Sequence, residues 1–328
     1  MKDGFEGEDP LRASTPLLHR HVLYPYGFAA HIKSNDPDVI RSAELSWGAY
    51  QERFREVPIE LRIIVSECVS RRQPQTPVFR AQSNLLTLVS DANNYGCCDL
   101  SKGFGFACLT RAAVTHGDFL RYNFLEGMIY TLLDTQYLAT IHGACISRGG
   151  CGVLLVGESG AGKSSLTYAC TRRGWTYISD DASSLVMRRR GRTVVGNPRT
   201  FRFRPSVSAL FPELQGHVKQ RNGKPTLEVR SDKFPDLKIA QECEVDYVIF
   251  LNRKPTQQEA QGLLPVSRAE RFRRLFQNPW PVELGIHEDR MAAIERLIEA
   301  PAYELSYQQF DPAIDLLEGL LSNAAPAS

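Results

Sequence analysis

The sequence predicts an α/β fold for the second half of the chain and a smaller mixed α+β domain before it. Beyond residue 137, apolar strand-like runs alternate with helical patterns, and a glycine-rich loop joins one strand to the helix that follows. The 328 residues suffice for two domains of about 150 residues each. We therefore expect an N-terminal domain over residues 1–136 and an α/β domain over residues 137–328.

The composition excludes several classes of protein. Hydrophobic residues make up 43% of the chain and charged residues 23%, which allows a sizeable core and excludes wholesale disorder. A net charge of +2 gives no reason to expect a nucleic-acid partner. No apolar run approaches the ~18 residues of a membrane-spanning helix, and the first residues lack the apolar segment of a secretory signal.

The eight cysteines are scattered along the chain without CxxC spacing. That distribution fits neither a zinc site nor a disulfide framework. We expect reduced thiols and hence a cytoplasmic protein.

The N-terminal region shows mixed signals. Apolar runs at Leu61–Val65 and Leu85–Val89 predict short strands. A helix is predicted over Asp118–Asp134, with Asp118 as its cap, because apolar residues recur there at spacings of three and four. The expected apolar face consists of Phe119, Tyr122, Leu125, Met128, Ile129, Leu132 and Leu133.

The second half reads as alternating strands and helices. Ser267 to Glu270 form a capping box before a helix. The predicted strands, of which the first two are joined by a turn at residues 148–150, are Leu138–Ser147, Val153–Val156, Trp175–Ser179, Leu185–Arg189, Thr193–Val195 and Tyr247–Leu251. The other predicted helices are Gly162–Arg173, Glu288–Glu299 and Ile314–Leu321.

Residues 157–164 read GESGAGKS, which is the full pattern of a phosphate-binding loop, between an apolar strand and a helix. The glycines let backbone N–H groups surround a phosphate, Lys163 would reach the β- and γ-phosphates, and Ser164 would be a magnesium ligand. We therefore expect ATP and Mg²⁺ as cofactors. The candidate nucleotide-binding residues are Gly157, Glu158, Ser159, Gly160, Ala161, Gly162, Lys163, Ser164 and Ser165.

Two adjacent carboxylates, Asp180 and Asp181, follow the next predicted strand. The carboxyl ends of strands form the ligand-binding edge of an α/β sheet. One carboxylate can hold magnesium and the other can accept a proton from a hydroxyl nucleophile, as a kinase requires. The competing interpretation is that one of them merely caps a turn.

His142 and a group of arginines are further candidates. A histidine in an apolar strand is more often a core residue, but this strand must run beside Val153–Val156 and so places His142 near the nucleotide. Residues 172–204 hold nine arginines against two aspartates. Those at 188–192 are typical of a solvated hairpin tip. Arg202 and Arg204 should share one strand face, where they could stabilise a transferring phosphoryl group.

The stretch from Ala139 to Arg204 resembles the catalytic domain of bacterial HPr kinase/phosphorylase, which phosphorylates a serine of the phosphocarrier protein HPr. The resemblance implies a P-loop kinase domain of that type, a mixed sheet with flanking helices. It implies that Asp180 is the general base, Asp181 supports magnesium and His142 lies near the transferred phosphate. Arg204 resembles the arginine of that family's Glu-x-Arg segment, and related kinases assemble as rings, which makes a homo-oligomer an expectation.

The chain departs from the family where Glu-Ile-Arg-Gly-Leu-Gly is replaced by residues 202–207, RFRPSV. Arg202 then occupies the family's acidic position, which counts against HPr as the acceptor and against phosphorylase activity. Some related proteins are similar to kinases that modify a serine in a ribosomal peptide precursor. We therefore expect ATP-dependent phosphorylation of a hydroxyl, a serine of a protein or peptide. The alternatives are a small-molecule kinase and a non-catalytic nucleotide sensor.

Overall fold

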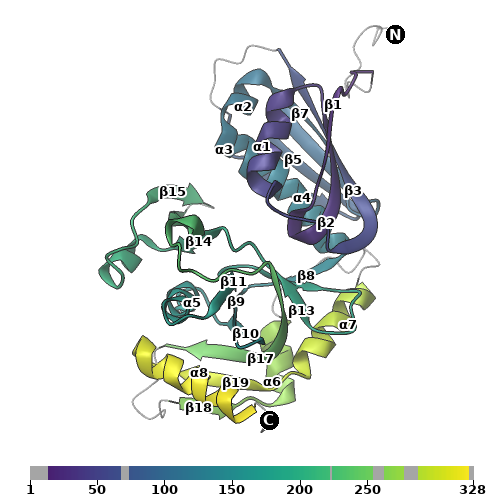
Figure 1. The fold of residues 1–328 in the computed structure, drawn as a ribbon. Coiled ribbons are helices and arrows are strands. Elements are labelled where there is room, and N and C mark those ends of the chain that lie inside the picture. The colour runs from purple at the N-terminus through teal and green to yellow at the C-terminus, as the bar shows by residue number, and fades with distance from the viewer. Residues whose placement is uncertain (1–13, 68–73, 222–223, 254–261, 277–286, 325–328) are drawn as a thin grey trace. The chain divides into compact units, whose positions relative to one another are not determined.

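The computed structural model describes residues 14–67, 74–221, 224–253, 262–276 and 287–324. These residues fall into two compact units (Figure 1). The first unit comprises the described residues up to Tyr137 together with His287, and the second comprises the other described residues from Leu138 onward. No described helix is long and apolar enough to cross a bilayer. The seven described cysteines form no disulfide, and Cys68 lies outside the described residues.

The first unit is a seven-stranded sheet in the order β1-β2-β3-β7-β6-β5-β4, with helices α1 and α4 against it (Figure 1). Strand β3 pairs in parallel with both β2 and β7, and the other pairs are antiparallel. The strands are β1 His19–Leu23, β2 Phe28–Ser34, β3 Phe54–Ser66, β4 Val78–Gln82, β5 Leu85–Asp91, β6 Asn94–Asp99 and β7 Phe104–Thr110. The helices are η1 Pro25–Gly27, α1 Pro37–Trp47, α2 Arg111–Thr115, α3 Gly117–Phe119, η2 Leu120–Leu125 and α4 Glu126–Gln136.

The predicted helix over Asp118–Asp134 is present, with a π-helical segment at Leu120–Leu125. A π turn holds more residues than an α turn, so it shifts the phase of the apolar face. Leu120 and Phe124 are buried in place of the expected Phe119 and Tyr122. The cap prediction was wrong, because Asp118 lies inside the first turn and His116 precedes it.

The second unit is built on a nine-stranded mixed sheet in the order β11-β9-β10-β17-β13-β12-β8, with β19 beside β17 and β18 beside β19. A separate three-stranded sheet has the order β14-β16-β15. The strands are β8 Leu138–Ile141, β9 Gly143–Arg148, β10 Cys151–Val156, β11 Thr176–Ser179, β12 Ser183–Val186, β13 Thr193–Val195, β14 Thr200–Phe203, β15 His217–Arg221, β16 Lys224–Arg230, β17 Glu242–Asn252, β18 Gly262–Pro265 and β19 Ala302–Ser306. The helices are α5 Lys163–Arg172, η3 Pro205–Ala209, η4 Ser231–Lys233, α6 Arg268–Leu275, α7 His287–Ile298 and α8 Phe310–Ala324.

The prediction of one strand over Leu138–Ser147 was wrong, because the chain changes partners at His142. Strand β8 pairs with β12, whereas β9 lies between β10 and β11. Gly143 permits the close approach, since a Cβ there would lie 2.9 Å from the carbonyl oxygen of Leu155. The predicted turn is confirmed: Gly149 and Gly150 have φ of 58° and 86°, as a two-residue hairpin loop of type I′ requires.

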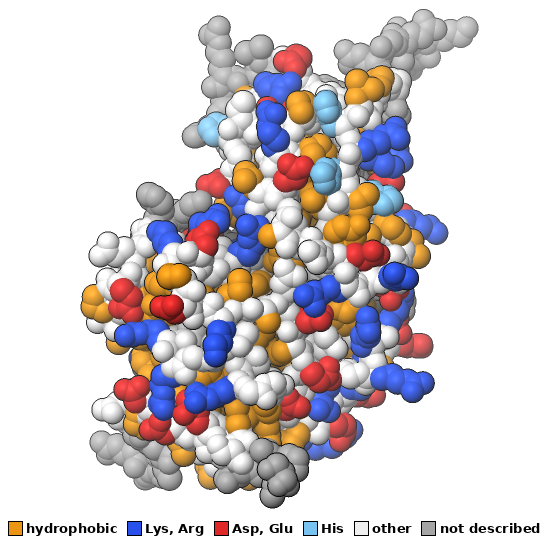
Figure 2. Space-filling view, in the orientation of Figure 1, with side chains coloured by type: hydrophobic (Ala, Val, Ile, Leu, Met, Phe, Trp, Pro, Cys, Tyr) orange, Lys and Arg blue, Asp and Glu red, His pale blue; other side chains and the backbone are white. Residues whose placement is uncertain are grey.

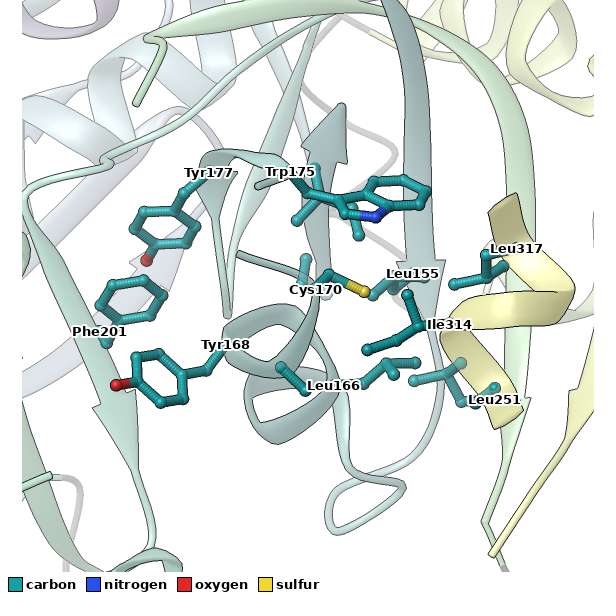
Figure 3. Packing of buried hydrophobic residues seen from close by; sticks show 14 of the residues in the cluster. Leu155, Leu166, Tyr168, Cys170, Trp175, Tyr177, Phe201, Leu251, Ile314 and Leu317 are labelled. Carbon is teal, nitrogen blue, oxygen red and sulfur yellow. The ribbon is translucent and has the colours of Figure 1, made fainter. Parts of the chain in front are cut away.

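Helix α5 is fixed by a continuous core on two sides. Figure 3 shows Leu166 and Cys170 of α5 facing Leu155 of β10, with Ile314 of α8 beside them. Towards the smaller sheet, Tyr168 meets the ring of Phe201 edge-on at 5.6 Å between centroids. Because α5 is held in this way, the loop that leads into it has a fixed end.

Candidate functional site

Four strands of the second unit end at the same edge of the main sheet. Strand β10 is parallel to β17, and β17 is parallel to β19. Strand β11 runs the same way as β10, because both are antiparallel to β9. The residues that follow these strands, Gly157, Asp180, Arg253 and Tyr307, therefore gather where α/β sheets bind ligands.

The glycine-rich loop lies between β10 and α5, so the predicted strand–loop–helix order is present. Gly160 and Gly162 adopt φ of 96° and 92°, which side-chain-bearing residues rarely adopt. A Cβ on Gly162 would also lie 2.6 Å from Oη of Tyr307. That hydroxyl donates a hydrogen bond of 3.1 Å to the carbonyl of Ala161, which ties the loop to the end of β19.

Lys163 is buried at the first position of α5, and its ammonium turns back over the loop. Nζ donates hydrogen bonds to the carbonyls of Gly157 at 2.6 Å and Glu158 at 3.1 Å. Burial lowers the pKa of Lys163, the Asp181 carboxylate opposes that shift, and the Arg204 cation adds to it. An anion bound at the loop would offset the free-energy cost of burying the Lys163 ammonium and would favour its charged form.

Ser164 and Ser165 are half-buried in the first turn of α5. The first backbone N–H groups of an α-helix have no partner within the helix, and the helix dipole favours an anion there. Together with the two left-handed glycines, these free donors form a cradle whose chemistry suits phosphate.

Asp180 and Asp181 are neighbours in very different surroundings. Asp180 is 3% exposed, and its Oδ2 accepts a 2.6 Å hydrogen bond from the backbone N–H of Arg202. Burial raises the pKa of Asp180 to about 7, against the opposing effects of the Arg202 charge and hydrogen bond. The side chain of Asp181 is 54% exposed. A carboxyl group that titrates near neutral pH can exchange a proton with a substrate, and an exposed carboxylate can bind a cation.

His142 lies in the link between β8 and β9, and its Nδ1 is 3.4 Å from Oδ1 of Asp181. Both side chains are about half exposed. The structure thus brings His142 to the edge of the sheet rather than into the core.

The expectation that Arg202 and Arg204 share a strand face was wrong, because β14 ends at Phe203. Nε of Arg202 is 3.4 Å from a carboxylate oxygen of Glu228 on the paired strand β16. Arg204 instead reaches the glycine-rich loop, where its Nη2 donates to Oγ of Ser159 at 3.1 Å. Of these two arginines, Arg204 therefore places its guanidinium on the loop and Arg202 pairs with Glu228.

The remaining arginines of residues 172–204 do not act as one group. Arg188 pairs with Asp289 at 3.1 Å, and Nε of Arg192 donates to the carbonyl of Val245 at 2.7 Å. Figure 2 shows basic and acidic side chains interspersed over the face turned to the viewer. The local charge excess in the sequence is thus partly neutralised by folding.

Sequence reasoning missed Arg253 and Tyr307 at this edge. Both follow directly on parallel strands, β17 and β19. The buried run Tyr247–Leu251 was recognised as a strand, so its end pointed to Arg253. Strand β19 is short and only partly apolar, which left Tyr307 without a signal.

Comparisons with known proteins find matches in the same part of the chain. Residues 136–203 match the family model of the HPr serine kinase C-terminal domain. The chain is 34% identical over 107 residues to the HPr kinase/phosphorylase of Chlorobium limicola, covering 33% of this chain and 29% of the relative. It is 42% identical over 89 residues to that of Lactobacillus delbrueckii subsp. bulgaricus, covering 25% of this chain and 26% of the relative.

A solved structure, the HPr(Ser) kinase/phosphatase from Coxiella burnetii, aligns with 56% of this chain and 88% of its own at 16% identity and a TM-score of 0.30. The matched stretches span less than a third of either curated relative. The family match contains His142, the glycine-rich loop and both aspartates, and it ends one residue before Arg204. Through residues 136–203, the chain is thus similar to the C-terminal kinase domain of the HPr kinase family.

Proposed function

We propose that this chain is a kinase that transfers the γ-phosphate of ATP, with Mg²⁺, to a serine hydroxyl of a protein or peptide. One observation carries the proposal. The buried ammonium of Lys163, the Asp181–His142 pair and the guanidinium of Arg204 lie on or next to one glycine-rich loop, beside the end of β11 that carries Asp180. A phosphate cradle, a proton acceptor and cations for the transferred group are the parts that phosphoryl transfer requires.

The loop fits a nucleotide and a magnesium ion. Its N–H groups and Lys163 would hold the phosphates, and the Ser164 hydroxyl and Asp181 carboxylate would hold the metal. Among the described residues, no group of three or more acidic, histidine or cysteine side chains is arranged so that it could hold a metal ion by itself. Magnesium in a kinase needs no such cluster, because substrate phosphates and water complete its coordination. When bound, Mg²⁺ neutralises charge on the phosphates.

Asp180 would act as the general base. The acceptor hydroxyl loses its proton to the Asp180 carboxylate, its oxygen forms the new bond to the γ-phosphorus, and ADP leaves. A pKa of about 7 suits this task, because the base is then ionised in part at neutral pH and still binds a proton well. In the reverse direction the protonated Asp180 would be the acid.

His142 and Arg204 would act on the group in transfer. Arg204 can place positive charge against the γ-phosphoryl oxygens from the side of Ser159. His142, held by Asp181, would lie near the transferred phosphate. Both assignments rest on the resemblance as well as on the geometry.

The acceptor is inferred from three grounds. The curated relatives are named for a kinase of the protein HPr. The first unit, which lies outside the family match, is large enough to be a recognition module. Arg202, paired with Glu228, stands where the family has an acid, which favours an acceptor other than HPr and argues against phosphorylase activity.

We place the protein in a reducing cytoplasm and expect it to form a homo-oligomer.

Radiolabelled ATP with extract of the native host tests this proposal. After reaction, the extract is separated into protein, peptide and small-molecule fractions, with Lys163→Ala enzyme as the control. We expect label on a serine in the protein or peptide fraction. Label confined to small molecules would support a metabolite kinase instead, and no label above the control would favour a nucleotide sensor.

A further inference from the structure

The sheet order separates two groups of residues around the glycine-rich loop. Strand β9, which begins just after His142, and strand β11, which ends just before Asp180, lie on one side of β10. Strands β17 and β19, which lead to Arg253 and Tyr307, lie on the other. The candidate acceptor groups therefore occupy one flank of the loop, and the second flank has no role in the proposed transfer.

Arg253 lies directly against this second flank. A Cβ on Gly162 would be 3.0 Å from Cδ of Arg253 and 3.5 Å from its Nη1. Arg204 approaches the loop at Gly160 on the acceptor flank, where a Cβ would be 3.4 Å from its Nη2. Two guanidinium groups thus meet the same loop at positions two residues apart.

The position of Arg253 is fixed by an aromatic support. Its guanidinium carbon lies 4.8 Å from the centroid of the Phe310 ring, at the first residue of α8. The backbone N–H of Tyr307 donates to the carbonyl of Asn252 at 3.0 Å, which links the two strand ends. Among the described residues no carboxylate pairs with Arg253, and its half-buried side chain faces the loop.

We propose that Arg253, supported by Phe310, binds the part of the nucleotide that is not transferred, by donating hydrogen bonds to its α- and β-phosphates. This inference rests on the proposed function and extends it by one residue. Gly162 is the last loop residue before α5, and the loop's N–H groups are the ones that cradle the α- and β-phosphates. A planar guanidinium is suited to bidentate contact with phosphate oxygens.

This placement predicts a particular kinetic signature. ADP keeps the α- and β-phosphates, so Arg253 would hold substrate and product nucleotide equally. Removing such uniform binding raises KM without lowering kcat. Removing a group that acts on the transferring phosphoryl lowers kcat instead, which is the expectation for Arg204.

The experiment compares Arg253→Gln, Arg253→Lys and Arg204→Gln with Arg188→Gln, in which the replaced arginine is half exposed and pairs with Asp289. Direct binding of ADP and GDP is measured by calorimetry. KM and kcat for ATP are measured with the fraction of the host extract that accepts the labelled phosphate. We expect Arg253→Gln to weaken both diphosphates by about tenfold or more, as loss of a charged hydrogen bond does, with kcat unchanged at saturation. Arg253→Lys should recover part of the affinity, and Arg188→Gln should match the wild type.

Wild-type ADP affinity in a folded Arg253→Gln protein would overturn the inference, as would a loss confined to ADP, which would indicate contact with the base. Thermal melting shows whether each variant is folded. A wild-type protein that binds neither diphosphate would instead overturn the proposed function, so the two failures are distinguishable.

Discussion

Asp180 and Asp181 differ in burial, and this difference predicts that replacing each aspartate with asparagine affects a different kinetic parameter. Asp180→Asn removes the basic oxygen and keeps the size of the side chain. We expect a loss in kcat of about 10²–10⁴-fold, typical of a general base, with a much smaller change in ADP affinity. Asp181→Asn should instead raise the magnesium concentration needed for half-maximal rate. Steady-state kinetics at varied Mg²⁺ separates the two.

If Asp180→Asn shifted the magnesium requirement and left kcat intact, the two roles would have to be exchanged. The exposed Asp181 would then be the proton acceptor, beside His142.

The pKa of Asp180 also makes a prediction about stability. Its folded value of about 7 lies above the ordinary value of 3.8, so between these values the folded protein binds more protons than the unfolded chain. Stability must therefore fall as pH rises from about 4 to about 7, and the full cost of the buried charge remains above pH 7. Urea titrations at several pH values should show this slope in the wild type, and Asp180→Asn should flatten it.

A slope equal in the two proteins would mean that Asp180 is ionised throughout this range. Its hydrogen bond from the Arg202 N–H would then outweigh the cost of burial.

At the scale of elements, helix α5 depends on the core beneath it. Leu166 is fully buried against β10. Leu166→Ala should destabilise the protein by about 2–5 kcal/mol, the usual cost of such a cavity. Arg172→Ala, on the exposed side of the same helix and paired with Glu213 at 3.1 Å, should cost less than about 1 kcal/mol. Denaturant unfolding of the two variants provides the comparison, and equal costs would contradict this account of the core.

Local patterns predicted the elements closest to the site. The apolar run at Val153–Val156, the glycine turn before it and the pattern of α5 are determined by neighbouring residues, and the structure confirms them. The break at His142 could not be predicted this way, because it arises when β8 and β9 take different partner strands. The π-helical segment at Leu120–Leu125 likewise changes a spacing that sequence periodicity assumes to be constant.

At the scale of the whole molecule, strand order decides which residues meet. Asp181 and Lys163 are close in sequence, so the electrostatic interaction between them was predictable from the motif and its spacing. Arg253 and Tyr307 come from strands about 90 and 140 residues beyond the loop, and only the parallel pairing of β10, β17 and β19 brings them there. In the first unit, the parallel placement of β3 between β2 and β7 is equally non-local.

The central claim is that the glycine-rich loop transfers phosphate from ATP. The most direct test measures phosphotransfer from γ-labelled ATP to the protein or peptide fraction of the host extract. Wild-type and Lys163→Ala enzyme are compared after unfolding curves have shown that both are folded. The account predicts that Lys163→Ala abolishes transfer, because the β- and γ-phosphates lose their buried cation. Transfer by Lys163→Ala at the wild-type rate would contradict it.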